Sequence, residues 1–118
     1  MEAQPSKQAK ILLVGAGQTN VLVSKFLTKY QYENVVVFNR SIEKAEKLSQ
    51  KFKNEFNSLA ELENYKGGFD VMIVCTGATE AIITKDLYSK IIGSDTSEKV
   101  IIDLAIPNNV DKEVTENF

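Results

Sequence analysis

The sequence predicts an α/β fold in which about five parallel strands form a doubly wound sheet with helices on both faces. Short β-branched runs alternate along the chain with longer segments of helical period, which is the pattern of repeated strand–helix–strand units. The apolar runs are continuous rather than alternating with polar residues, as expected of strands that are covered on both faces. With right-handed crossovers, these units give the strand order 3-2-1-4-5.

Five short runs rich in apolar or β-branched residues are predicted to be the strands. In chain order they are Lys10–Val14, Val35–Phe38, a weak run at Phe56–Ser58, Val71–Cys75 and Val100–Asp103. Gly67-Gly68 breaks the chain before the fourth strand, and Pro107 with Asn108-Asn109 ends the fifth.

Apolar residues at helical spacing predict the connections between these strands. The first helix is expected from Gln18 to Tyr30, and Ser41 and Thr84 are placed to cap two later helices. The apolar faces comprise Leu22, Val23, Phe26, Leu27 and Tyr30 in the first helix, Ala45, Leu48 and Phe52 in the second, Leu59, Leu62 and Tyr65 in a short helical turn, and Leu87, Tyr88, Ile91 and Ile92 in the last helix.

Size and composition limit the classes of function. The chain has 118 residues, which fits one domain over residues 10–118 after a polar, flexible segment over residues 1–9. A net charge of −2 provides no general attraction for nucleic acid or acidic membranes. The single cysteine, Cys75, excludes an internal disulfide and fits a reducing compartment. No apolar run resembles a signal peptide or a membrane span, so we expect a cytoplasmic protein without a membrane partner.

A glycine-containing turn lies between the first predicted strand and the first predicted helix: Gly15-Ala16-Gly17-Gln18-Thr19-Asn20. This context is the one that the dinucleotide fingerprint of Rossmann-type domains requires. Gly15 permits a tight turn, Gly17 allows the backbone to approach a pyrophosphate, and Thr19 can add a hydroxyl to the free N–H groups of the helix start. Asn20 replaces the third glycine, so we expect a wider approach of helix to strand. The alternative is an ordinary tight turn.

The residues after the second strand indicate which dinucleotide is bound. An NAD site has an acidic side chain there, whereas this chain has Asn39-Arg40-Ser41. Arg40 can stack on adenine or bind phosphate oxygens, and Ser41 can present a hydroxyl. Lys44 lies in the first turn of a helix, where a cation opposes the helix dipole unless a phosphate compensates. These residues favour NADP(H) over NAD(H); alternatively, Ser41 is a plain cap and Lys44 a solvated surface residue.

The fourth and fifth strands are expected to flank the nicotinamide half of the cofactor. Thr76-Gly77-Ala78 follows the fourth strand, where Thr76 can bind a ribose or phosphate and Gly77 either allows close approach or only makes a turn. We interpret Asp103 as a partner of nearby backbone rather than a general base. Cys75 is interpreted as a small buried hydrophobe, because the chain has no histidine to activate it. We therefore predict no catalytic residue and no metal site in this chain.

Four blocks together resemble the NADPH-binding domain of glutamyl-tRNA reductase: Ile11–Asn20, Asn39–Ser41, Thr76–Ala78 and Ile102–Pro107. The likeness extends from Lys10 to Val114. Shikimate dehydrogenases have a block similar to Asn39–Ser41, whereas the block Ile102–Pro107 is typical of glutamyl-tRNA reductase. Two departures are Cys75, where serine is usual, and Asn108, where arginine is frequent.

The resemblance implies that the parent protein reduces glutamyl-tRNA to glutamate-1-semialdehyde, the entry step to tetrapyrroles. It also implies a catalytic cysteine in an upstream domain and a helical dimerisation domain downstream, so the full-length protein would be a homodimer. We expect this chain to be an excised cofactor domain, monomeric and inactive alone. Its Gly15–Asn20 loop would hold the pyrophosphate, Asn39, Arg40 and Ser41 the 2′-phosphate, and Thr76, Gly77 and Ala78 the nicotinamide half. The alternatives are the cofactor domain of a shikimate/quinate-type dehydrogenase and a stand-alone nucleotide-sensing regulatory module.

Overall fold

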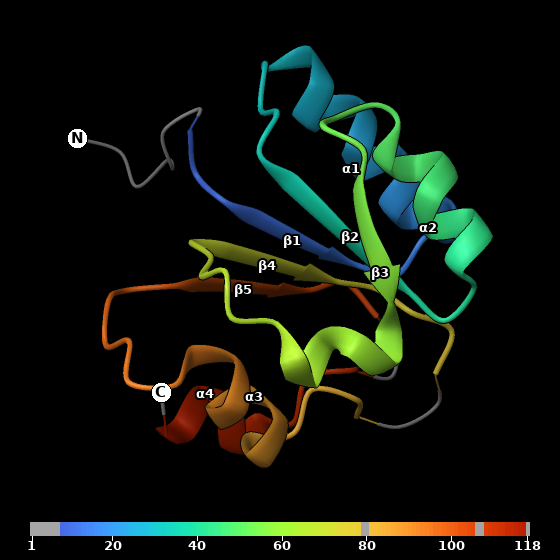
Figure 1. The fold of residues 1–118 in the computed structure, drawn as a ribbon. Helices are drawn as coiled ribbons and strands as arrows, with labels where there is room; N and C mark the ends of the chain where they lie inside the picture. Colours follow the sequence, from blue (N-terminus) through green and yellow to red (C-terminus); the bar gives the residue numbers. More distant parts are fainter. Residues whose placement is uncertain (1–7, 79–80, 106–107, 118) are drawn as a thin grey trace.

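Five parallel strands form one sheet in the order β3-β2-β1-β4-β5, which confirms the predicted fold class and topology (Figure 1). The computed structural model describes residues 8–78, 81–105 and 108–117, so the N-terminal segment over residues 1–7 and the end of the fifth-strand block, Ile106-Pro107, lie outside the described residues. The strands are β1 (Ile11–Val14), β2 (Val35–Asn39), β3 (Glu55–Ser58), β4 (Val71–Val74) and β5 (Val100–Asp103).

Helical segments cover both faces of the sheet (Figure 1). They are α1 (Gln18–Lys29), α2 (Ile42–Ser49), a 3-10 helix η1 (Leu59–Asn64), α3 (Lys85–Ile92) and α4 (Lys112–Asn117). The two expected caps are confirmed, because Ser41 accepts the N–H of Lys44 at 3.4 Å and Thr84 accepts that of Leu87 at 3.2 Å. No sequence pattern predicted α4. Within the described residues, no helix combines the length and apolar character needed to cross a membrane.

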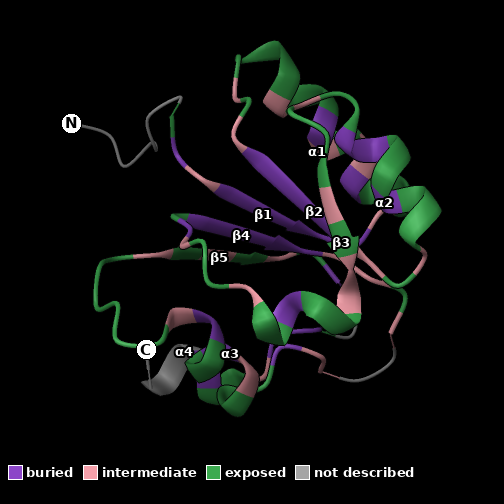
Figure 2. Cartoon of the chain, in the orientation of Figure 1, coloured by how far each residue is buried: buried purple, intermediate pink, exposed green. Residues whose placement is uncertain are grey.

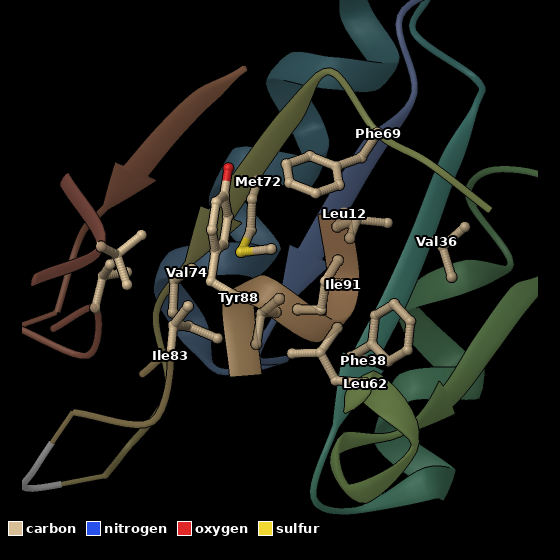
Figure 3. Packing of buried hydrophobic residues seen from close by; sticks show 13 residues of the cluster. Leu12, Val36, Phe38, Leu62, Phe69, Met72, Val74, Ile83, Tyr88 and Ile91 are labelled. Atoms are coloured by element: carbon tan, nitrogen blue, oxygen red, sulfur yellow. The ribbon is translucent and has the colours of Figure 1, made fainter. Parts of the chain in front are cut away.

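Alternate residues of each inner strand contribute to two apolar layers, one on either face of the sheet. Figure 2 shows that the inner strands are buried, and Figure 3 shows the layer that contains Leu12 and Phe38. The layer beneath α1 and α2 contains Ile11, Leu13, Val35, Val37, Val71 and Ile73 with Ala45 and Leu48. The opposite layer contains Leu12, Val14, Val36, Phe38, Met72 and Val74 with Leu62, Ile83, Tyr88, Ile91 and Val114. All twelve strand residues in these two sets are classed as buried, so the continuous apolar runs reflect strands covered on both faces.

The apolar face of α1 is turned only partly toward the sheet. Leu22, Phe26 and Tyr30 have exposed fractions of 56%, 62% and 55%, whereas the residues of α1 that are fully buried are Asn20 and Ser24. Polar side chains are tolerated there because both find backbone acceptors: Ser24 donates to the carbonyl of Val21, and Asn20 donates to the turn before the helix. Periodicity alone therefore misjudged which face of this helix packs on the strands.

The 3-10 helix η1 is fastened to the sheet through the tyrosine that follows it. The Tyr65 ring packs edge-on against Phe38 with centroids 5.6 Å apart, and its hydroxyl donates to the carbonyl of Gly68 at 2.8 Å. Burial, and secondarily the nearby Glu55 carboxylate, raises the pKa of Tyr65 to about 12. The ring contact and the hydroxyl hydrogen bond together hold the end of η1 against Phe38 of β2.

Removing the side chain of Leu12 is expected to destabilise the fold strongly. Leu12 lies on the central strand with no exposed surface, so Leu12→Ala leaves a cavity and should lower the free energy of unfolding by roughly 3 kcal/mol. Leu22→Ala makes the same chemical change on an exposed helix position and should change it by no more than about 0.5 kcal/mol. Urea denaturation of both variants measures the difference, and equal effects would contradict the assigned core.

Candidate functional site

The predicted site residues gather where the carboxyl ends of β1, β2 and β4 meet. β1 lies between β2 and β4, in register from Ile11 to Val14 with both neighbours. The turns that leave these three strands therefore lie at one edge of the sheet. In an open parallel sheet, this edge at the switch between strands one and four is where ligands bind.

Gly15 makes a turn that another residue could not make without strain. Its φ is +106°, and a Cβ atom there would lie 2.1 Å from the carbonyl oxygen of Cys75. The backbone is held on both sides, because the Gly15 N–H donates to Phe38 and the Cys75 N–H donates to Val14. Gly15 is thus required by the packing of the sheet itself, whether or not a ligand is present.

Asn39 is bound to the glycine turn. Its Oδ1 accepts the N–H of Ala16 at 3.1 Å, and its Nδ2 donates to the carbonyl of Ser41 at 3.1 Å. The expectation for Asn39 was direct contact with a 2′-phosphate. In the structure its amide joins the turn after β1 to the turn after β2, so the Ala16 N–H is already bound within the protein, and contact of Asn39 with a 2′-phosphate stays a prediction.

Asn20, which replaces the third fingerprint glycine, is fully buried at the start of α1. Its Nδ2 donates to the carbonyls of Val14 at 3.0 Å and Gly15 at 2.9 Å. Among the residues that the structure describes, its Oδ1 has no hydrogen-bond partner. The side chain therefore occupies the space between helix and strand and grips the turn that precedes the helix.

The amino end of α1 is open, in contrast to those of α2 and α3. Its N-cap is Gly17, which offers no side-chain acceptor, and its first turn contains no acidic residue. Within the described residues, the N–H groups of Gln18 and Thr19 have no acceptor. A Cβ atom on Gly17 would meet no described residue within 4 Å, so this part of the chain leaves open space beside the start of the helix. Free N–H groups and the positive end of the helix dipole form an anion-binding site.

Arg40 lies beside a pocket of ≈ 550 Å³ at the same edge of the sheet. The pocket is walled by η1, by the segment before α3 and by the start of α3, through residues such as Leu59, Ile83 and Leu87. Arg40 is exposed and has no ion-pair partner within the described residues. The glycine turn does not line this pocket, so the open helix end and the pocket are two neighbouring parts of the site rather than one enclosed cavity.

Ser41 and Lys44 are arranged as cap and capped residue. The Ser41 hydroxyl oxygen accepts the N–H of Lys44, which was one of the two interpretations that the sequence allowed. The Lys44 side chain is exposed and has no salt-bridge partner within the described part of the chain. Arg40 and Lys44 thus place two solvent-accessible positive charges near the end of β2, where no carboxylate is present in the strand-end triplet Asn39–Ser41.

The loop after β4 is held by a buried asparagine that the sequence did not single out. Asn109 has no exposed surface, and its Oδ1 accepts from both the N–H and the hydroxyl of Thr76, at 2.9 and 2.8 Å. Its Nδ2 donates to the carbonyl of Ala78, whose own N–H is bound by the Thr76 hydroxyl. Thr76 is therefore used to shape the loop. Gly77, by contrast, borders open space as far as the described residues show, because a Cβ atom there would meet none of them within 4 Å.

Sequence reasoning could not identify Asn109, because an asparagine after a proline reads only as a turn signal. Its role arises from contacts with residues more than thirty positions away. Its backbone carbonyl also accepts the N–H groups of Ile82 and Ile83, so the segment before α3 depends on it too.

Asp103 acts on nearby backbone, as predicted. Its two carboxylate oxygens accept the N–H groups of Ala105 at 3.1 Å and Val110 at 2.7 Å. Cys75 is half-buried at the end of β4. Within the described residues, no group of three or more histidine, cysteine or acidic side chains could hold a metal ion. The arrangement is suited to binding an anionic ligand.

Comparison with known proteins places this geometry in a family. The model of the shikimate/quinate 5-dehydrogenase family matches residues 1–117. The chain belongs to that family. Among the curated proteins similar to this chain, the glutamyl-tRNA reductase of Methanococcus aeolicus is 41% identical over 109 residues, and that of Carboxydothermus hydrogenoformans is 34% identical over 110 residues. The resemblance to glutamyl-tRNA reductase drawn from the sequence motifs is thereby confirmed.

The chain spans about a quarter of the length of these relatives, 27% and 24% respectively, while they match 90% and 93% of the chain. Among solved structures, the glutamyl-tRNA reductase of Methanopyrus kandleri superposes with a TM-score of 0.80 at 29% identity, over 95% of this chain and 28% of that one. A structure described as the nucleotide binding domain of glutamyl-tRNA reductase from Thermoplasma volcanium has a TM-score of 0.67 at 22% identity, over 92% of this chain and 82% of that one, which supports the shared fold.

Replacing Asn109 should destabilise the protein because several polar groups lose their partner together. Asn109→Ala leaves the Thr76 N–H and the Ala78 carbonyl unpaired in a half-buried loop, so we expect the free energy of unfolding to fall by about 2 kcal/mol. The neighbouring Asn108 is exposed and makes only a 3.5 Å contact, so Asn108→Ala should have an effect within about 0.5 kcal/mol. Urea denaturation distinguishes the two, and an Asn109 variant as stable as the Asn108 variant would refute the role assigned to Asn109.

Proposed function

We propose that this chain is the NADP(H)-binding domain of a glutamyl-tRNA reductase. The observation that carries the proposal is the uncapped amino end of α1, which begins with Gly17 and has free N–H groups beside open space. The α-helices α2 and α3 are capped by their own side chains, and the uncapped 3-10 helix η1 has Glu61 in its first turn, whereas the first turn of α1 has neither a cap nor an acidic residue. A bound diphosphate would supply at α1 the acceptor atoms and negative charge that the protein provides elsewhere.

The residues after β2 support NADP(H) rather than NAD(H). A carboxylate at the strand end would accept from a ribose 2′-hydroxyl and repel a 2′-phosphate, and the strand-end triplet Asn39–Ser41 contains none. Arg40 is exposed on the rim of a pocket whose volume falls in the range of small-molecule sites, so its guanidinium can stack on an adenine there while it contacts a phosphate. Lys44 adds a second cation within reach of the same region.

The chemistry supplied by the bound cofactor is hydride transfer, and this chain contributes binding and orientation. The open helix end holds the diphosphate, and the Asn109-braced loop over Thr76–Ala78 provides a rigid wall for the nicotinamide half. The reduction of glutamyl-tRNA, the cysteine that forms the thioester, and dimerisation are assigned to other parts of a longer protein. The description of the matched family makes the cofactor half of a shikimate- or quinate-type dehydrogenase the second candidate, and the similarity to glutamyl-tRNA reductases favours the first.

The domain should bind NADPH more tightly than NADH, and Arg40→Asp should remove the preference. Loss of a charge-assisted contact and gain of a repulsive carboxylate should weaken NADPH binding by about tenfold to a hundredfold, with a much smaller effect on NADH. Isothermal titration calorimetry with both nucleotides measures this. Lys53→Asp makes the same charge change just ahead of β3, at the opposite edge of the sheet, and should alter affinity by less than about twofold because such distant charges are screened. Equal affinities of the unmodified protein for NADPH and NADH would exclude the proposed cofactor preference.

The chain alone should produce no semialdehyde from glutamyl-tRNA in the presence of NADPH, because the residues described here bind nucleotide without forming the thioester. A product assay by mass spectrometry tests this. Calorimetric titration of the same protein with NADPH is the control that it is folded. Measurable turnover would show that the catalytic group lies within residues 1–118 and would contradict the assignment to a cofactor domain.

A further inference from the structure

One peptide plane of the glycine turn is held at both ends by asparagine side chains. In the Gly15–Ala16 peptide, the carbonyl oxygen accepts from Asn20 Nδ2 at 2.9 Å and the N–H donates to Asn39 Oδ1 at 3.1 Å. The Asn20 amide also reaches the preceding carbonyl, that of Val14, at 3.0 Å. We infer that Asn20 is a positioning residue of the nucleotide site, which acts with Asn39 as a clamp on the turn that presents the open end of α1. The inference rests on the proposed function, because the clamp is assigned to a site for a diphosphate.

The orientation of the Asn20 amide is determined by its surroundings. Two carbonyl oxygens face Nδ2, so exchanging the nitrogen and oxygen positions would set Oδ1 against two acceptors. Oδ1 consequently points where no described residue offers it a partner, although Asn20 is fully buried. An unpaired buried oxygen is unfavourable, and an apolar side chain at this position would avoid it. The two bonds of Nδ2 to the turn are therefore the interaction that explains an asparagine here.

The clamp matters because the turn has almost no side chains to hold it. Gly15 has a positive φ, and the peptide planes on either side of a glycine rotate more freely than those of other residues. Asn20 thus binds the carbonyls of Val14 and Gly15, while within the described residues the N–H groups of Gln18 and Thr19 at the start of α1 have no acceptor. A turn fixed in this state before binding loses less conformational freedom when it receives a diphosphate. In the usual fingerprint a third glycine allows helix and strand to pack closely. Here Asn20 occupies that position, and its side chain forms hydrogen bonds to the turn instead.

A clamp on the turn and a purely structural asparagine predict different results. The diphosphate is common to NADPH and NADH, so loss of the clamp should weaken both nucleotides by the same factor. This separates Asn20 from Arg40, which should discriminate between them. A purely structural role would lower stability and leave the affinity of the folded protein unchanged.

The first test compares Asn20→Ala with Ser24→Ala. Ser24 is also fully buried on α1, but its hydroxyl donates to Val21 within the helix and not to the turn. Calorimetric titration should show that Asn20→Ala weakens NADPH and NADH each by about tenfold, as expected for the loss of two hydrogen bonds that preorganise the site. Ser24→Ala should retain the affinities of the unmodified protein within about twofold, even where thermal unfolding shows a comparable loss of stability.

The second test uses Asn20→Asp, which keeps the size of the side chain. Its neutral carboxyl group can donate one hydrogen bond to a carbonyl of the turn, whereas the ionised form has no donor and faces two oxygens. Burial and these oxygens raise its pKa, so the clamp is present at low pH and lost as the pH rises through that raised value. The affinity of Asn20→Asp for NADPH, divided by that of the unmodified protein at the same pH, should fall between about pH 5 and 8. The ratio removes the titration of the cofactor's own phosphate.

Three results separate the possible failures. If the unmodified protein binds neither nucleotide, the proposed function fails and this inference fails with it. If the unmodified protein binds NADPH but Asn20→Ala binds both nucleotides within about twofold of it, the clamp is refuted while the proposed function stands. If Asn20→Ala does not fold, Asn20→Asp compared between acid pH, where the clamp is present, and higher pH, where it is lost, provides the test, and a ratio that does not change with pH overturns the inference.

Discussion

The approach of Gly15 to the carbonyl of Cys75 is the constraint on which the functional edge of this molecule depends. Parallel pairing of β1 with β4 brings the ends of these strands together, and the chain must leave β1 in a direction that only glycine adopts without strain. That exit direction determines where α1 begins, and hence where its free N–H groups are exposed. The position of the open helix end is thus a consequence of sheet packing.

Irregular backbone at the carboxyl edge of a sheet creates a second constraint, because every buried N–H and C=O group needs a partner. Three asparagines meet this need: Asn20 and Asn39 on the turn after β1, and Asn109 on the loop after β4. An amide side chain is suited to the task because it carries donors and an acceptor a short distance apart and can bind a C=O and an N–H together. The same residue type therefore supports both halves of the crevice, through contacts between segments that are distant in the sequence.

The two halves differ in what they leave available to a ligand. Beside β2, the side chains of Arg40 and Lys44 are exposed, and a pocket lies next to them. Beyond β4, the polar groups of Thr76 are already bound by Asn109, and the open space borders Gly77. A ligand with a charged, phosphorylated end and a flat, less charged end matches this division. The division supports the proposed orientation of a phosphorylated dinucleotide across the sheet.

The sequence by itself determined the fold class, the strand order, two helix caps and the backbone role of Asp103, because each depends on local pattern or on general rules of parallel sheets. It also located the glycine turn and the residues after β2. Only the tertiary structure decided that Asn39 and Thr76 spend their polar atoms on neighbouring loops, that Asn109 is the centre of one of those loops, and that Leu22, Phe26 and Tyr30 lie mainly in solvent. The physical reason is that a hydrogen-bond partner or a covered face is set by which distant segment packs alongside, and periodicity and motif spacing along one chain do not contain that information.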